Sequence, residues 1–402
     1  MVTFNTLGDM LLRRYIVDFI ATMQNLSAPI YTQLRENSNF IPAGDGAYFA
    51  VRIAGNEAGG GWRATDDNVL PTAGNEQVKQ ARVRPKKYYH TVTFSGLAEA
   101  VSARGGEDAF AAGITDALSN AVKRAGARFE TDFLRGDGTG RLTNCGTGST
   151  STVIAVDDAR PFRTGQVIVG LNNTTGLRNW GPVTVTSRDI ANSQITVSSS
   201  VTWATDDGIY ISGEQSEASA PAEVTALGLP AIVSATGTIY NISRTTYPIL
   251  QSKVIAAGSV ALDEALLRRL RRQLLVETDV GSLNGFVMIS NWEQYDRYTE
   301  ISLPFRRFPD MRLELGAQQE LTTFEGRPWL ISHQALPDQV FQLNLGAIER
   351  GVVRPLSIDE RVNMAWVPGQ DAFTVLMKYY GENVARMINQ TAKLTGLTTP
   401  TY

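Results

Sequence analysis

Apolar residues recur every three or four positions between residues 106 and 134, and this spacing predicts a long amphipathic helix. Its apolar stripe is formed by Phe110, Ile114, Leu118, Ala121 or Val122, Ala125, Phe129 and Phe133. The opposite face carries Asp116, Asn120, Lys123, Arg124, Arg128 and Asp132, so this side can face water. Acidic residues at 107 and 108 favour a helix start, and the glycine-rich run 136–140 favours a stop. We expect this helix to be the rigid spine of the protein.

Alternating apolar and polar residues ahead of the helix predict two strands, 47–54 and a return strand through 78–94. About twenty polar, glycine-rich residues join them into a hairpin spanning 46–95. Such a ribbon buries little by itself, so its large and charged side chains are candidate contacts to a partner surface. These candidates are Trp62, Arg63, Arg82, Arg84, Lys86 and Lys87. The alternative is a solvated flexible loop.

After the helix, Thr, Ser, Val, Asn and Gly dominate residues 141–213. Short strands are predicted at 152–156, 166–169, 183–186, 194–197 and 208–212. Their spacing, with turns between them, is typical of a small antiparallel barrel or sandwich. We therefore predict an inserted β domain over 143–222, with 216–221 as its exit linker.

Mixed structure is predicted from residue 223 onward. A helix is expected over 260–276, with Ser259 as N-cap and Leu262, Leu266, Leu270 and Leu274 buried. Its basic run Arg268, Arg269, Arg271 and Arg272 is interpreted as a solvated face, with an anion or nucleic-acid site as the alternative. A buried strand at 286–290 precedes a short helix at 291–298.

The remaining elements are predicted as follows: short helices at 6–23 and 30–35, a rigid loop at 304–309 with two exposed-looking aromatics, strands at 313–315, 321–324, 328–332, 340–344 and 348–353, and a β-like C-terminal segment at 372–391.

Composition narrows the class of protein. The chain has 402 residues and a formal net charge of −3, which argues against a general nucleic-acid binder. Cys145 is the single cysteine, which excludes an internal disulfide framework. No stretch reaches the ~20 apolar residues of a membrane span. The two histidines, His90 and His333, lack ligand-like spacing, and no catalytic motif is present, so we expect no enzyme activity, metal or cofactor.

The order of these parts carries a resemblance. An N-terminal arm, a long hairpin with a glycine-rich tip, a spine helix and a mixed domain closing on a β-like segment together resemble the HK97-type major capsid proteins of tailed bacteriophages. The segment 237–248, which contains Arg244, and the run Phe286–Tyr295 are similar in style to that family. The resemblance implies an α+β fold with an arm at 1–45, an extended hairpin at 46–95, a spine and peripheral domain at 96–142 completed by 371–402, the inserted β domain at 143–222 and an axial domain at 223–370.

The resemblance further implies a shell subunit that forms hexamers and pentamers around phage double-stranded DNA in a virion assembled in the bacterial cytoplasm. A scaffolding protein, a portal and a decoration protein are the implied partners, with no membrane and no sequence-specific DNA binding. Arg244 and the loop residues Phe305, Arg306, Arg307 and Phe308 join the hairpin residues as implied subunit contacts.

Departures from the family also matter. Lys79, Lys86 and Lys87 lie near the hairpin base and none lies at the tip, so covalent cross-linking is not expected. No long helical segment precedes the arm, so a fused scaffold is not expected either. The alternatives are an encapsulin-like nanocompartment shell and, from another class, an adhesive or carbohydrate-binding β protein.

Overall fold

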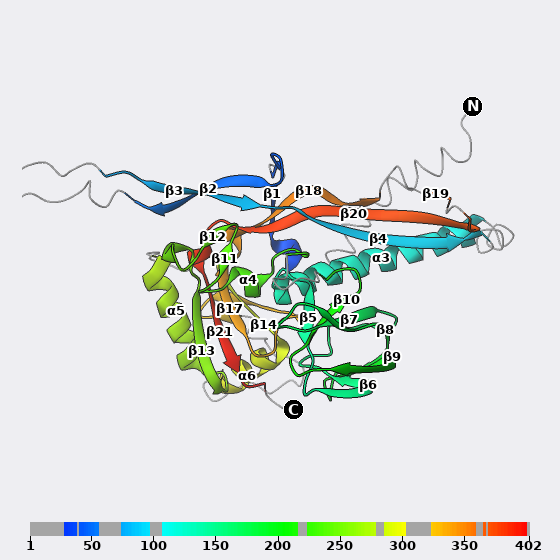
Figure 1. The fold of residues 1–402 in the computed structure, drawn as a ribbon. Coiled ribbons are helices and arrows are strands. Elements are labelled where there is room, and N and C mark those ends of the chain that lie inside the picture. The colour runs from blue at the N-terminus through cyan, green and yellow to red at the C-terminus, as the bar shows by residue number, and fades with distance from the viewer. Residues whose placement is uncertain are drawn as a thin grey trace, which may run out of the picture.

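The computed structural model describes residues 28–37, 40–55, 74–96, 107–215, 223–278, 285–302, 323–358, 365–366 and 369–399. A long sheet runs along one side of the molecule, with helix α3 beneath it (Figure 1). A small β barrel and a second large sheet lie on the same side as the helix (Figure 1). The helix expected at 6–23, the loop at 304–309 and the strand at 313–315 fall outside the described residues.

Strand β20 (Ala372–Ala385) is the centre of the long sheet. Along one edge it pairs with β4 (Lys86–Ser95), from Gly381 opposite Lys86 to Ala372 opposite Ser95. Along the other edge it pairs with β18 (Ile348–Ile358) and β19 (Ala365–Trp366). The short strand β1 (Arg35–Asn37) adds to β18 in parallel. A single-turn 3₁₀ helix, Tyr31–Gln33, precedes β1, so the α-helix expected over 30–35 is wrong.

The spine helix is confirmed as α3, Glu107–Arg135. From Leu118 onward its predicted stripe is buried; side chains before residue 117 are not described. Phe129 contacts the rings of Tyr88 on β4 and Tyr379 on β20, with centroid distances of 5.0 and 4.8 Å. The helix is therefore fixed against the long sheet by its aromatic side chains.

The hairpin differs from the sequence prediction in one respect. Strand β2 (Ala47–Ala54) pairs only with β3 (Gln77–Val83), while the rest of the return strand becomes β4 in the long sheet. Arg84 and Pro85 separate β3 from β4, and proline cannot donate a backbone hydrogen bond to a ladder. The β2–β3 ribbon extends beyond the rest of the described chain (Figure 1).

Residues 141–211 form a six-stranded sheet in the order β5-β10-β7-β8-β9-β6. The strands are β5 (Arg141–Asn144), β6 (Ser149–Ala155), β7 (Val167–Leu171), β8 (Arg178–Asp189), β9 (Gln194–Trp203) and β10 (Gly208–Ile211). A bridge between Cys145 and Val156 joins the two outer strands, so the sheet closes on itself as a barrel. The sequence pattern does not predict strand β5, because its four residues follow directly on the glycine-rich turn that ends α3.

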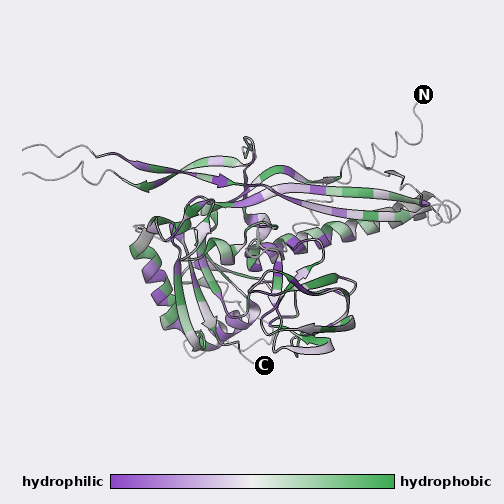
Figure 2. Cartoon of the chain, in the orientation of Figure 1, coloured by the Kyte–Doolittle hydropathy of each residue, from purple (hydrophilic) through white to green (hydrophobic). Residues whose placement is uncertain are grey.

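The second large sheet has the order β13-β21-β17-β14-β16-β15. Its strands are β13 (Lys253–Val260), β21 (Thr391–Leu397), β17 (Val340–Asn344), β14 (Phe286–Ser290), β16 (Arg327–Ile331) and β15 (Thr323–Phe324). Helices α5 (Glu264–Thr278) and α6 (Trp292–Ser302) pack on it, with Leu267, Leu270 and Tyr295 in the shared core. Figure 2 shows hydrophobic and hydrophilic residues alternating along the turns of α5.

Helix α5 begins four residues later than the sequence predicts, at residue 264 and not at residue 260. Val260 belongs to β13, and the helix begins at Glu264, whose backbone N–H donates to the Asp263 carboxylate at 2.7 Å. Asp263, and not Ser259, therefore occupies the N-cap position, where its backbone carbonyl accepts from the N–H groups of Leu266 and Leu267. The C-terminal segment is also divided, because a 3₁₀ turn at Ile388–Gln390 separates β20 in one sheet from β21 in the other.

Three small elements link the layers: α4 (Leu229–Ile232) lies next to α3, and β11 (Thr238–Ile239) pairs with β12 (Ile242–Ser243). Gly228, directly before α4, packs against the end of α3. A Cβ at this position would lie 2.2 Å from the Asp132 carbonyl oxygen and 2.5 Å from that of Gly136. The close approach of the two backbones therefore requires glycine.

Candidate assembly surfaces

The β2–β3 ribbon is anchored at its base. Phe49, Val51 and Ile53 pack against the main hydrophobic core, and Phe49 contacts the Tyr240 ring at 5.8 Å. Toward the tip, β3 is exposed from Gln77 to Gln80, and Val78 is 52% exposed. The ribbon therefore packs on the core through β2, whereas the outer half of β3 faces solvent with an unpaired backbone edge, which is a surface suited to a partner chain.

Two candidate residues of the ribbon already have a partner within the chain. Arg82 and Arg84 donate to the same Asp45 carboxylate oxygen at 3.1 and 2.8 Å. The hydrogen bond from Arg84, with that from Tyr48 and the charge of Arg82, lowers the pKa of Asp45. These side chains fix the ribbon's entry to the body, although Arg84 stays exposed.

The two lysines at the start of β4 have different surroundings. Lys86 donates to the Glu223 carbonyl at 2.9 Å and to its carboxylate at 3.2 Å, whereas Lys87 is exposed. Lys86 also faces Glu382, a buried carboxyl that accepts from the backbone N–H groups of Leu227 and Asn383. Burial raises the pKa of Glu382 to about 8, despite the opposing charge of Lys86 and the two hydrogen bonds.

The prediction that Arg244 is a subunit contact does not agree with its burial in the structure. Its side chain is 2% exposed and donates to the carbonyl oxygens of Thr236, Ala231 and Ile232 at 3.2, 2.9 and 2.8 Å. Burial lowers its pKa to about 10. Arg244 thus holds together the turn around β11 and β12 and is not an exposed contact residue. Trp62, Arg63 and the loop residues Phe305, Arg306, Arg307 and Phe308 lie outside the described residues.

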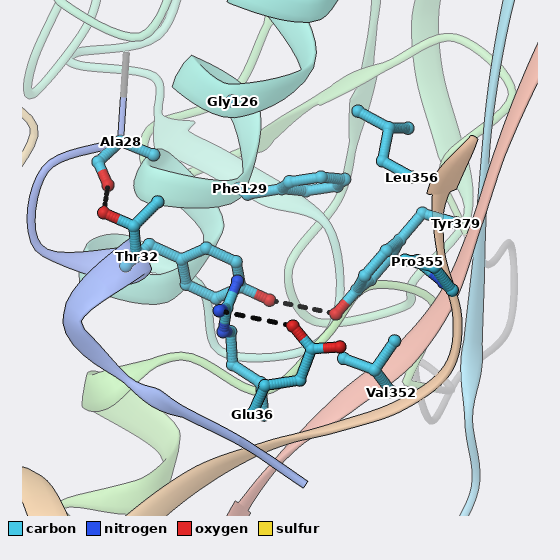
Figure 3. Close-up of a pocket in the computed structure, with 11 residues that line it drawn as sticks. Ala28, Thr32, Glu36, Gly126, Phe129, Val352, Pro355, Leu356 and Tyr379 are labelled. Carbon is cyan, nitrogen blue, oxygen red and sulfur yellow. Dashed lines mark hydrogen bonds and ion pairs between the residues drawn. The ribbon is translucent and has the colours of Figure 1, made fainter. Parts of the chain in front are cut away.

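The N-terminal segment is tied to both the spine helix and the long sheet. The Tyr31 backbone N–H donates to Glu130 of α3 at 2.9 Å, and the hydroxyls of Tyr31 and Tyr379 lie 3.1 Å apart. Arg350 stacks over the Tyr31 ring at 5.2 Å and pairs with Glu36 at 3.6 Å. A cavity of about 40 Å³ remains between them, and Figure 3 shows Phe129 and Tyr379 facing it. This volume is large enough for water and too small for a substrate.

The last turns of α3 are less solvated than the sequence predicted. Arg128 pairs with Asp132 at 3.0 Å and with Glu214, just beyond the barrel, at 2.8 Å. Arg135 is buried and pairs with Asp158 of the barrel, and it also donates to the Gln334 carbonyl. These contacts join the helix, the barrel and the second sheet. Their partners lie far apart in the sequence, so no local pattern of residues predicts them.

The described residues offer no catalytic arrangement. Cys145 is buried in the barrel, which raises its thiol pKa to about 12, and His90 stacks on Tyr88. In the described part of the chain, no group of three or more His, Cys, Asp or Glu side chains is placed to hold a metal ion. None of the helices among these residues has the length and apolar character needed to span a bilayer.

A long sheet backed by a spine helix, an extended ribbon and a second sheet fed by the same C-terminal segment define an HK97-type capsid fold. The chain is similar to one from the solved structure of the cyanophage A-1(L) capsid asymmetric unit, with 13% identity, 93% of each chain covered and a TM-score of 0.54. This likeness confirms the α+β capsid fold expected from the sequence.

Further matches are weaker. A chain from Gordonia phage Cozz is 11% identical, covers 93% of this chain and 87% of its own, and has a TM-score of 0.47. A chain from the capsid of Myoviridae phage XM1 is 11% identical, covers 90% of both chains and has a TM-score of 0.46. No protein-family model and no curated protein sequence matches the chain.

Proposed function

We propose that this chain is a major capsid subunit that assembles into hexamers and pentamers of the icosahedral head of a tailed phage, around double-stranded DNA. The single observation that carries this proposal is the capsid fold shared over 93% of both chains with the cyanophage A-1(L) structure.

The domain layout follows from the same proposal. Residues 1–45 form the arm, 46–95 the extended hairpin, and 96–142 with 371–402 the peripheral domain. The barrel is an inserted domain over 143–222, and 223–370 form the axial domain whose loops meet at the symmetry axes. Support comes from the ribbon, which packs on its own core through β2 and exposes the outer half of β3, because the exposed strand edge can lie on a neighbouring subunit.

Several subunit contacts are proposed on this layout. Trp62 and Arg63 at the hairpin tip, the exposed Arg84 and Lys87 at its base, and the loop residues Phe305, Arg306, Arg307 and Phe308 face neighbours in the shell, whereas Arg82 and Lys86 act through their partners Asp45 and Glu223 within the chain. Polar contacts of this kind fix the register between subunits more than they add affinity. A scaffolding protein, a portal and a decoration protein are the proposed partners, and the virion is the proposed location.

Negative-stain electron microscopy of the purified full-length chain tests the proposal, alone and together with a scaffolding protein from the same genome. Closed icosahedral shells, or rings of five and six subunits, are expected. A small monodisperse particle at every concentration and with every scaffold would refute it. Nucleic acid inside native particles is expected for a phage head, whereas protein cargo without nucleic acid would indicate a nanocompartment.

A further inference from the structure

A cleft of about 730 Å³ lies where four parts of the chain meet. Helix α3 forms one wall with Lys123, Arg124 and Glu130, and the barrel contributes Arg163 from the turn before β7. Trp292 at the start of α6 and His333 after β16 form the wall from the second sheet. The N-terminal segment reaches the cleft at Pro29.

The cations of this cleft are not neutralised within the described chain. Arg135 and Arg160, which lie beside it, are paired with Asp158 and Glu293. By contrast, no ion pair among the described residues involves Lys123, Arg124 or Arg163, and both α3 residues are exposed. The cleft therefore presents three unpaired positive charges around one buried carboxylate, that of Glu130.

These charges are close enough to affect one another. Burial and the like charges of Arg188 and Arg124 lower the pKa of Arg163. Burial and the charges of Arg163 and other neighbouring arginines lower the pKa of His333. Arg188 itself is held in place by the carbonyl oxygens of Arg160 and Phe162, both at 2.8 Å. Cationic side chains of the barrel and of helix α3 therefore line the same cleft, and this arrangement depends on the position of the barrel.

The floor and rim of the cleft distinguish between anionic ligands. Gln334 lines the cleft, is 4% exposed, and its side-chain oxygen has no hydrogen-bond partner among the described residues. A buried acceptor of this kind requires a hydrogen-bond donor. A polypeptide carries both amide donors and carboxylates, whereas a phosphodiester backbone carries acceptors only and is repelled by Glu130. The indole of Trp292, 47% exposed at the rim, adds apolar surface for side chains.

We propose that this basic cleft binds an acidic polypeptide segment of a partner protein, with Lys123, Arg124 and Arg163 pairing with its carboxylates. The concave shape admits an extended chain, while a DNA duplex presents its phosphates on a convex cylinder. The inference rests on side chains of one subunit, so it does not require that a shell forms.

The test is fluorescence anisotropy of labelled octaglutamate with the full-length protein at low ionic strength. Replacing Lys123→Glu and Arg124→Glu together is expected to weaken binding about tenfold or more, since each removes a charge-assisted contact and adds repulsion. The milder pair Lys123→Gln and Arg124→Gln should give an intermediate loss. A matched control is Arg269→Glu with Arg272→Glu, which makes the same charge change on the exposed face of α5 and is expected to leave binding unchanged.

Three results would overturn the proposal. One is equal weakening by the α5 control, which would mean that only overall charge matters. Another is binding of a labelled DNA duplex that is tighter than octaglutamate and lost in the α3 variant, which would assign the cleft to nucleic acid. The third is unchanged peptide affinity in an α3 variant whose circular dichroism melting curve matches the wild type. Shell formation by electron microscopy is scored separately, so failure here leaves the capsid proposal standing.

Discussion

The pair between Arg135 and Asp158 gives the sharpest test of how the barrel is attached to the spine helix. Among the described residues, Asp158 is the one carboxylate within ion-pair distance of Arg135, whose side chain is 2% exposed, and Asp158→Ala removes it. Burial lowers the pKa of Arg135 and Asp158 opposes that effect, so the substitution leaves a buried cation less compensated. Breaking a buried pair in this way costs about 3–5 kcal/mol.

We expect the lower end of that range, about 3 kcal/mol, because Arg135 keeps the carbonyl oxygens of Gln334 and Ala335 as acceptors. The free energy of unfolding is measured by urea denaturation, following intrinsic fluorescence. The double variant Arg135→Met/Asp158→Leu should recover most of the loss, since replacing both charges by apolar groups removes the unpaired cation. Arg268→Ala, which breaks an exposed helix pair with Glu264, is the control and should cost less than about 0.5 kcal/mol.

A cost below about 1 kcal/mol for Asp158→Ala, in the range of exposed pairs, would refute the reasoning. It would mean that water reaches Arg135 and that the barrel is not attached to the helix through a buried charge. A double variant as unstable as the single one would instead show that lost packing, and not the unpaired charge, sets the cost.

Four further outcomes are expected. Folding raises the pKa of Glu382 to about 8, so between about pH 4.5 and pH 8 the folded state holds a proton that the unfolded state has lost, and the free energy of unfolding should fall with rising pH. Glu382→Gln should remove this part of the pH dependence, measured by urea denaturation at several pH values. An unchanged pH dependence would contradict the prediction. Phe133→Ala, at a fully buried position, should cost about 3–5 kcal/mol by the same assay, and a cost near zero would place this ring outside the core. Gly228→Ala should lower the free energy of unfolding by about 1–3 kcal/mol, because its Cβ clashes with the carbonyl oxygens at the end of α3. The control is Gly237→Ala, where no atom crowds the Cβ and only the backbone cost of a positive φ is measured. Trp62→Ala should leave subunit unfolding nearly unchanged while lowering shell yield by electron microscopy, and an unfolded subunit would instead show that the hairpin packs internally.

Periodicity predicted the elements that are regular over a long stretch. The stripe from Leu118 to Phe133 predicts α3, and the strand predicted at 340–344 is β17. Strand spacing predicts a small barrel or sandwich, and the structure has a barrel. It does not predict β5, because four residues after a glycine turn carry too little pattern. The predicted start of α5 is wrong because Ser259 and Asp263 are both good N-cap residues, and only the pairing of β13 with β21 decides between them.

Contacts were harder to predict than elements. The sequence treats Arg244 and Arg82 alike, as basic residues in polar segments, yet one is buried against three carbonyl oxygens and the other borders the ribbon. Burial of an arginine depends on acceptors that the fold supplies from distant residues, and no local pattern records them. The basic cleft was missed for the same reason, since Lys123, Arg163 and His333 come from three separate parts of the chain.

The division of the return strand at Pro85 has a mechanical consequence. On one side of this residue, β2 and β3 hold each other; on the other side, every residue of β4 is paired with β20. A rotation of the ribbon about residues 84 and 85 therefore breaks no rung of either ladder. It works instead against the packing of Phe49 and the buried Val83, and against the hydrogen bond from the Arg82 N–H to the Tyr240 carbonyl. The joint therefore separates the direction of the ribbon from the integrity of the long sheet, because neither ladder crosses residues 84 and 85.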